Sequence, residues 1–208
     1  MAGPISHVVF AEKAAHSFLN VEDEPQFIVG NLFPDIRYLD VVDRRSSHSE
    51  GVTIADIQRE SDSFKAGVLL HSLVDETREG RVTKSNVYKL LPNSPLISVA
   101  LKICEDMKLY DCTPNWQTYI NYMDLILTQE LDYGVAKSDI RRWHDINIDL
   151  FTNPSITEYG RLLAKIGFDK SQINEVLELV GYINAHKVVE LYLDDLHSDF
   201  RSLLETGA

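Results

Sequence analysis

Hydrophobic residues recur at spacings of three and four along almost the whole chain, which is the period of an amphipathic α-helix. The first such set falls within residues 5–19 and comprises Val8, Ala11, Ala15, Phe18 and Leu19. A short apolar helix is predicted over 25–33, and Pro34 should end it. We find no strand-like alternation of apolar and polar residues and no internal repeat. The pattern predicts an all-α protein.

The most apolar helix is predicted from Phe64 to Arg78, and because it is apolar nearly all round it should be buried. The polar segment 38–63 precedes it. We predict a long ordered loop there, with one short helical turn near Ile54 and Ile57 and with His48 as its only tether to the candidate site. Loops of this length inside compact domains are usually functional or disordered.

Later helix starts are indicated by Ser94-Pro95 and Thr113-Pro114, where a capping residue precedes a first-turn proline. Further helices are predicted over 136–151, 155–166 and 171–203. A chain of 208 residues suffices for one sizeable core. We therefore expect a single all-helical domain, a multi-helix bundle, with the candidate chemistry in residues 1–80 and a helical remainder in 81–208.

The charge of the chain narrows the classes of partner. Hydrophobic residues make up 44% and charged residues 25%, as in globular proteins, and the formal net charge is −12. Such a charge disfavours nucleic acids and anionic membrane surfaces as partners. No apolar run approaches the roughly 18 residues of a membrane span, and the first seven residues lack the features of a signal peptide. We therefore expect no membrane insertion and a cytoplasmic protein.

Within the buried helix, His71 and Asp75 stand one turn apart on one face. Their neighbours on that face are apolar or small: Phe64, Gly67, Val68 and Val74. Burying an imidazole and a carboxylate without partners costs free energy. The pair therefore needs either a bound metal ion or a private network of hydrogen bonds.

Three other residues have metal-ligand chemistry in a suitable context. His7 lies on the inward face of the first helix, Asp35 follows a proline at a helix end, and His48 is carried by the polar loop. Imidazoles with carboxylates suit zinc or a similar divalent ion. Taken singly, a residue such as His7 is more often a hydrogen-bonded core histidine, one such as Asp35 is often a turn or cap residue, and one such as His48 is usually solvated. His16 follows nine residues after His7 and is rotated about half a turn around the helix axis from it, so it should not share the inward face of His7.

Four short motifs follow one another within residues 4–80. They are Pro4-Ile5-Ser6-His7 opening a helix, Phe33-Pro34-Asp35-Ile36 after an apolar run, a loop histidine, and Ala66-Gly67-Val68-Leu69-Leu70-His71-Ser72-Leu73-Val74-Asp75. In this order they resemble the zinc-dependent phospholipase C family, which is all-helical and related to the fungal single-strand nucleases. The resemblance implies that Asp35, His48, His71 and Asp75 bind one zinc ion. It also implies that His7, with Asp75 as a bridge, contributes to a second.

The resemblance stops after Asp75, where the family's next histidine and its His-x-x-x-Glu pair have no counterpart. His186 and Glu190 have the i,i+4 spacing but stand too far along the chain, and we expect an ordinary helix surface there. We also expect His144, after two arginines, to lie at the surface.

The favoured function is a zinc-dependent phosphoric ester hydrolase that uses a metal-activated water. Asp35 and Asp75 would orient that water while binding the ion. Arg37, Tyr38 and Arg78 are the candidate contacts for a small phosphate-ester substrate, although surface pairing with carboxylates would explain them equally. The alternative is a structural or non-catalytic metal site in a helical protein that binds a partner or forms a homo-oligomer. A nuclease is disfavoured because the chain has no basic track lined with aromatic residues.

Overall fold

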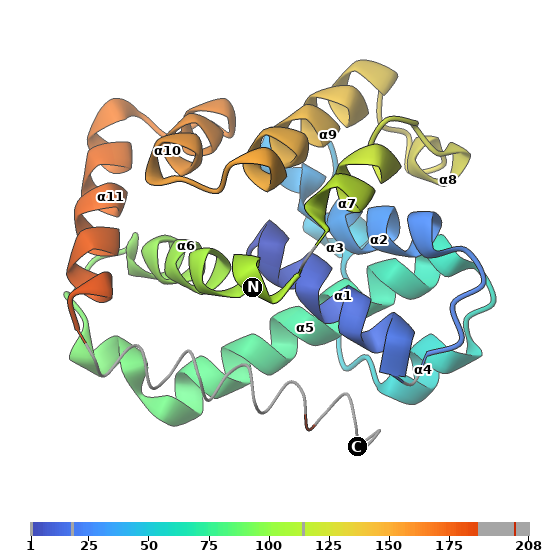
Figure 1. Cartoon of the computed structure of the whole chain (residues 1–208), viewed down its shortest axis with the longest axis horizontal. Helices are drawn as coiled ribbons and strands as arrows, with labels where there is room; N and C mark the ends of the chain where they lie inside the picture. The colour runs from blue at the N-terminus through green and yellow to red at the C-terminus, as the bar shows by residue number, and fades with distance from the viewer. Residues whose placement is uncertain (1, 18, 114, 187–201, 203–208) are drawn as a thin grey trace.

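Every regular element of the described residues is helical in the computed structural model, which describes residues 2–17, 19–113, 115–186 and 202 (Figure 1). The elements are α1 (Pro4–Ser17), α2 (Glu24–Leu32), the 3₁₀-helix η1 (Phe33–Leu39), α3 (Arg44–Ser47), α4 (Ile54–Arg59), α5 (Ser63–Ser85), η2 (Val87–Leu90), α6 (Ile97–Leu109), η3 (Tyr110–Cys112), α7 (Trp116–Tyr122), α8 (Thr128–Leu131), α9 (Lys137–Thr152), α10 (Ile156–Lys165) and α11 (Lys170–Asn184). The all-α prediction is confirmed. In this part of the chain, no helix is both long and apolar enough to cross a membrane.

Short polar side chains begin several of these helices, as the sequence indicates. The carboxylate of Asp62 accepts a hydrogen bond from the Lys65 amide at the start of α5, and the Ser155 hydroxyl accepts one from the Glu158 amide at the start of α10. These bonds satisfy amides that have no partner inside the helix. The helices therefore start close to the predicted positions.

The helix boundaries differ from the prediction in several places. α6 and α7 begin at Ile97 and Trp116, two residues after the predicted first-turn prolines, and their N-cap residues are Leu96 and Asn115 rather than Ser94 and Thr113. Pro34 does not stop the helical path, because the chain continues as η1 with the proline in its first turn, where no amide is required. α5 extends past Arg78 to Ser85 and ends at Asn86, which adopts a left-handed conformation. The segment 38–63 contains two helices, α3 and α4, where one turn was expected. Of the helix predicted over 171–203, the part after His186 lies outside the described residues, except for 202.

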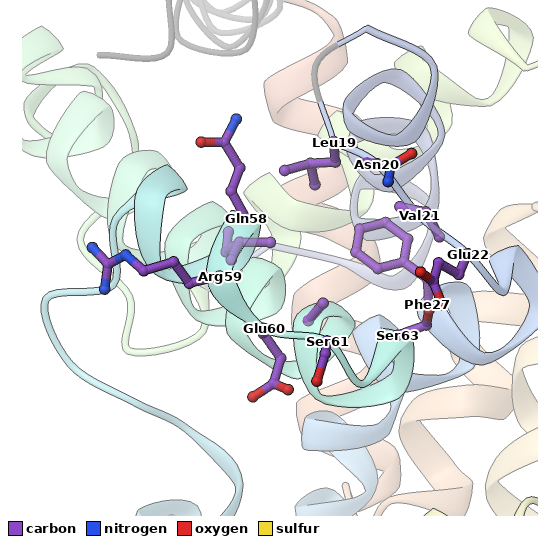
Figure 2. Close-up of a pocket in the computed structure, with 12 residues that line it drawn as sticks. Leu19, Asn20, Val21, Glu22, Phe27, Gln58, Arg59, Glu60, Ser61 and Ser63 are labelled. Carbon is purple, nitrogen blue, oxygen red and sulfur yellow. The ribbon is translucent and has the colours of Figure 1, made fainter.

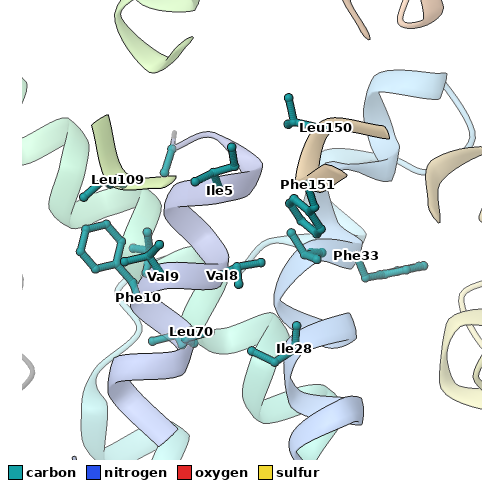
Figure 3. Packing of buried hydrophobic residues seen from close by; sticks show 14 of the residues in the cluster. Ile5, Val8, Val9, Phe10, Ile28, Phe33, Leu70, Leu109, Leu150 and Phe151 are labelled. Carbon is teal, nitrogen blue, oxygen red and sulfur yellow. The ribbon is translucent and has the colours of Figure 1, made fainter. Parts of the chain in front are cut away.

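A single cluster of buried apolar side chains runs from Ala2 to Ile183. In Figure 1, α5 crosses the lower part of the molecule, α1 and α2 lie above it, and α9 and α10 lie at the top. Figure 3 shows side chains of α1, α2, α5 and α9 meeting inside this core, among them Val8, Ile28, Leu70 and Phe151. Each such buried side chain contributes about 1.5–3 kcal/mol by leaving water.

Helix α2 crosses α5 closely at two glycines. A Cβ atom on Gly30 would stand 2.1 Å from the Phe64 carbonyl oxygen, and one on Gly67 would stand 2.1 Å from the Phe27 carbonyl oxygen. Both distances are far below van der Waals contact. The two backbones can approach this closely only because neither position carries a side chain.

We predict that Gly67→Ala lowers the free energy of unfolding by about 2 kcal/mol or more, because the new methyl group has to push α2 away from α5. Gly80→Ala is the matched control in the same helix. No atom lies within 4 Å of the added Cβ there, so this variant should gain roughly 0.5–1 kcal/mol from helix propensity. Urea unfolding of both variants measures the difference. Equal effects of the two substitutions would contradict the crossing.

Candidate metal centre

The five residues singled out in the sequence come together at one buried point. α1 supplies His7, η1 supplies Asp35, the residue after α3 is His48, and α5 supplies His71 and Asp75. Four of them are at most 4% exposed, and the side chain of His48 is 5% exposed. Two overlapping sets of potential ligands result, His7 with His71 and Asp75, and Asp35 with His48 and His71.

The ring of His71 is held in a defined orientation by Asn31. Its Nδ1 donates a hydrogen bond to the Asn31 carbonyl oxygen over 2.8 Å. The close crossing of α2 and α5 brings this carbonyl oxygen within reach of the ring. The Asn31 side chain in turn donates to the His7 carbonyl oxygen over 2.8 Å, so it ties α2 to α1. A carbonyl oxygen only accepts, so in the neutral ring Nδ1 carries the proton and Nε2 has a free lone pair. Metal-binding histidines are commonly oriented in this way.

The lone pair of His71 Nε2 points into a group of other acceptors. It lies 3.2 Å from His48 Nε2, 3.7 Å from Asp75 Oδ2 and 3.9 Å from Asp35 Oδ1. The His48 Nε2 atom is also 3.8 Å from Asp75 Oδ2. Nitrogen ligands bound to tetrahedral zinc at its usual bond length lie about 3.3 Å apart. The imidazole nitrogens therefore already have a zinc-like separation, and the carboxylates stand slightly wider.

His7 joins the group by stacking on the ring of His71. The two rings are stacked, with centroids 3.9 Å apart and planes at 8°. Neither ring nitrogen of His7 makes a hydrogen bond, although its Nε2 lies 3.5 Å from Asp75 Oδ1. That carboxylate oxygen accepts a hydrogen bond of 2.6 Å from the Ala2 amide. His16 is exposed, as expected.

A network of hydrogen bonds alone satisfies these groups poorly. A proton on His48 Nε2 would satisfy its contact with His71, with Ser47 Oγ 3.0 Å from His48 Nδ1 on the other side. It would still leave the His7 nitrogens and Asp35 Oδ1 buried without a hydrogen bond. Unsatisfied buried polar atoms are costly. A divalent cation could bind His7, His71 and Asp75, or Asp35, His48 and His71, so the residues present fit such an ion.

The protonation of the centre favours metal binding. Burial lowers the pKa of His71 to about 3 and that of His48 to about 4. Burial alone would raise the pKa of Asp75, but its contacts with His7 and His71 hold it below its usual range. At neutral pH, His48 and His71 are uncharged and Asp75 is ionised, which is the state a metal ion requires.

The loop that carries His48 is held at several points, so the expectation of a single tether is wrong. The Ser49 amide donates to Ser72 Oγ over 3.1 Å, and the Gly51 amide donates to Glu76 Oε1 over 2.9 Å. Both acceptors belong to α5. The position of His48 is therefore fixed by the loop backbone as well as by its own side chain.

The three expected substrate contacts differ in their surroundings. Arg37 Nη2 lies 3.3 Å from Asp35 Oδ1, and the guanidinium stacks 4.2 Å from the ring centroid of Tyr38. Both lie next to the centre. Arg78 is 1% exposed and forms a bidentate pair with Glu105 of α6, with Nε–Oε2 and Nη2–Oε1 distances of 2.8 and 3.0 Å. It joins α5 to α6, and we assign it no contact with a substrate.

Sequence reasoning missed Lys102 of α6. Its Nζ donates a hydrogen bond to Tyr38 Oη over 3.4 Å, which places the ammonium group beside the residues next to the centre. The signal was available: Lys102 interrupts an otherwise apolar helical stretch, between Leu101 and Ile103, both of which are buried.

The expectation that His144 lies at the surface is wrong. It is 1% exposed, with Nε2 2.7 Å from Glu130 Oε1 and Nδ1 3.0 Å from the Met123 carbonyl oxygen. His144 shares the inward face of α9 with Ile140 and Trp143, and this spacing outweighs the preceding arginines. His186 is exposed, as expected, and Glu190 lies outside the described residues.

Comparison with known proteins adds no relative. No protein-family model, no curated protein and no solved structure matches this chain. The resemblance drawn from the short motifs therefore remains a prediction, and the argument for function depends on the geometry of the centre.

We predict that the metal-free protein becomes less stable as the pH falls from about 6.5 to about 4. In this window the unfolded chain protonates His48 and His71, whose usual pKa is 6.5, while the folded chain keeps them neutral. The fold therefore loses the stability that it has above pH 6.5, and His71 alone accounts for at most about 1.4 kcal/mol per pH unit.

Urea unfolding in the presence of chelator, at steps between pH 7.5 and 5, measures this loss. His71→Ala should show a shallower pH dependence than the wild type, whereas His16→Ala, at an exposed position, should keep the wild-type slope. A slope unchanged in His71→Ala would contradict the assignment.

Proposed function

We propose that this protein is a metal-dependent phosphoric ester hydrolase, with one or two divalent ions, most simply zinc, held by His7, Asp35, His48, His71 and Asp75. One observation carries the proposal. Three imidazoles and two carboxylates converge at a buried point where the fixed lone pair of His71 faces other acceptors. When bound, such an ion supplies Lewis acidity, acidifying water and neutralising charge that develops on phosphate oxygens.

Asp35 has two roles in this proposal. Its Oδ1 makes no hydrogen bond in the buried cluster, and the residue also lines a pocket beside the centre. A carboxylate in this position holds the ion and accepts a proton from the attacking water. Asp75, which accepts the hydrogen bond from the Ala2 amide, mainly holds the imidazoles and the ion in place.

Arg37 and Tyr38 serve the substrate. A guanidinium group is repelled by the metal ion but suits a pair of phosphate oxygens. The pKa of Tyr38 is raised by burial and by the nearby charge of Asp35, so its hydroxyl stays protonated at neutral pH. It can therefore donate a hydrogen bond to an anionic ligand.

A structural metal site is the second candidate, and the burial of the cluster favours it. His7 and His71 are at most 1% exposed, and structural sites are commonly closed in this way. Both candidate functions require the metal ion, and they differ in whether the protein hydrolyses a substrate. The hydrolase is preferred because the pocket at Asp35 gives access to one side of the cluster.

We predict that protein purified without chelator and without a metal-affinity column contains at least one divalent transition-metal ion per chain. His71→Ala should lose this ion and unfold at a lower temperature, because it removes a buried ligand from a site coupled to folding. His16→Ala, an exposed histidine of α1, is the control and should change neither quantity. Elemental analysis and thermal unfolding measure both. Metal-free protein that is fully stable would exclude the site.

We further predict metal-dependent hydrolysis of bis(p-nitrophenyl) phosphate or p-nitrophenyl phosphate, inhibited by chelator. Asp35→Asn should lower kcat by roughly 100-fold or more, because the amide keeps the shape but loses the charge. Asp40→Asn is the control: Asp40 is exposed and has a positive φ of 58°, a conformation that asparagine tolerates. Stoichiometric metal without turnover across a broad set of esters would favour the structural site.

A further inference from the structure

A pocket of about 90 Å³ lies directly beside the candidate metal centre. It is formed between α6, α9, α10 and the N-terminal residues, and Asp35 and Tyr38 of η1 also line it. Most of its wall is apolar and includes Val99, Ile103, Leu162, Leu163, Ile166 and Phe168. The pocket thus has a mostly apolar wall that also includes a metal-ligand candidate, Asp35.

Lys102 is the only lysine or arginine among the residues that line this pocket. Its Nζ has the single hydrogen bond to Tyr38 Oη, and in the described part of the chain no carboxylate oxygen lies within 4.0 Å of it. Asp106, which also lines the pocket, accepts hydrogen bonds from Ser6 and Tyr159 instead. Burial lowers the pKa of Lys102, as expected for a cation without a close counterion.

A cation in such surroundings is costly unless something compensates it. The fold supplies a carboxylate partner to Arg78 but none at contact distance to Lys102, which stands one turn before Asp106 on the same helix. An anionic ligand in the pocket would be that partner. An ammonium group with three donors binds phosphate oxygens as a point charge.

We propose that Lys102 binds a phosphate oxygen of the substrate and that the apolar pocket accepts a compact apolar substituent of the same ester. This inference rests on the proposed hydrolase. The phosphate group then lies between Asp35, at the centre, and Lys102, with the Tyr38 hydroxyl as a further donor. Substrates are phosphoric esters of small apolar alcohols rather than of sugars or nucleosides.

A second hollow does not have this combination of residues. It has a volume of about 190 Å³ and lies between the α1–α2 connection and the residues around α4 (Figure 2). Leu19, Phe27 and Gln58 are among its lining residues, and none of the five metal-ligand candidates is. It therefore offers nothing to a reaction at the centre.

Binding of alkylphosphonates tests the proposal without any need for turnover. Isothermal titration calorimetry of the protein with its metal should show that n-propylphosphonate binds about tenfold more tightly than methylphosphonate, because two further methylene groups are buried. Lys102→Met should weaken the binding of both phosphonates at least about tenfold. Lys102→Arg should retain most of the affinity. Lys108→Met, the same change at an exposed position of α6, is the control and should bind like the wild type.

Two further measurements separate binding from structure. Lys102→Met should unfold at no lower temperature than the wild type, because it removes a partly buried charge without an ion-pair partner. Val99→Phe should fill the pocket and abolish the preference for propyl over methyl while methylphosphonate still binds.

Equal affinities of Lys102→Met and Lys108→Met, or no preference for the propyl group in the wild type, would overturn the inference even if esters are hydrolysed. Phosphonate binding that depends on Lys102 and on chain length, without hydrolysis of any ester, would support the binding pocket and contradict the hydrolase. The two claims therefore fail separately.

Discussion

The fixed orientation of the His71 ring is the constraint on which the rest of the centre depends. Its Nδ1 is bound to the Asn31 carbonyl, so its Nε2 has to face His48, Asp35 and Asp75. That bond exists because α2 and α5 cross at two glycines. The orientation of the His71 ring therefore depends on the packing of α2 against α5. A shift of either helix would turn the imidazole away from the other candidate ligands.

Buried polar contacts hold α1 and α5, which carry three of the candidate ligands, against the neighbouring helices α2 and α6. Asn31 links α2 to both α1 and α5, and the pair of Arg78 with Glu105 links α5 to α6. Asp106 of α6 accepts hydrogen bonds from the Ile5 and Ser6 amides at the start of α1, which places the helix that carries His7. Burial raises the pKa of Asp106 to about 6, so the fold holds this carboxyl group at a cost in free energy. Several buried polar groups are therefore used to position a few ligands.

The sequence predicts the all-α class well because helical periodicity is a local signal. The spacing of Val8 and Ala11, or of His71 and Asp75, gives the inward face of a helix directly. It does not show which distant residue that face meets. The contacts of Lys102 with Tyr38, and of His144 with Glu130, join residues that are far apart in the chain, and no periodicity encodes them. The loop around His48 was predicted with too few contacts for the same reason.

The most direct test of the account is the position of an ion in crystals of the protein grown without chelator, located by anomalous scattering at the absorption edge of the metal found by elemental analysis. We predict an anomalous peak between the imidazoles of His48 and His71, about 2.0–2.1 Å from each Nε2 atom if the metal is zinc. A map without a peak at this position, from protein with the same arrangement of the five side chains, would contradict the account. The five buried side chains would then interact through hydrogen bonds alone, without a metal ion.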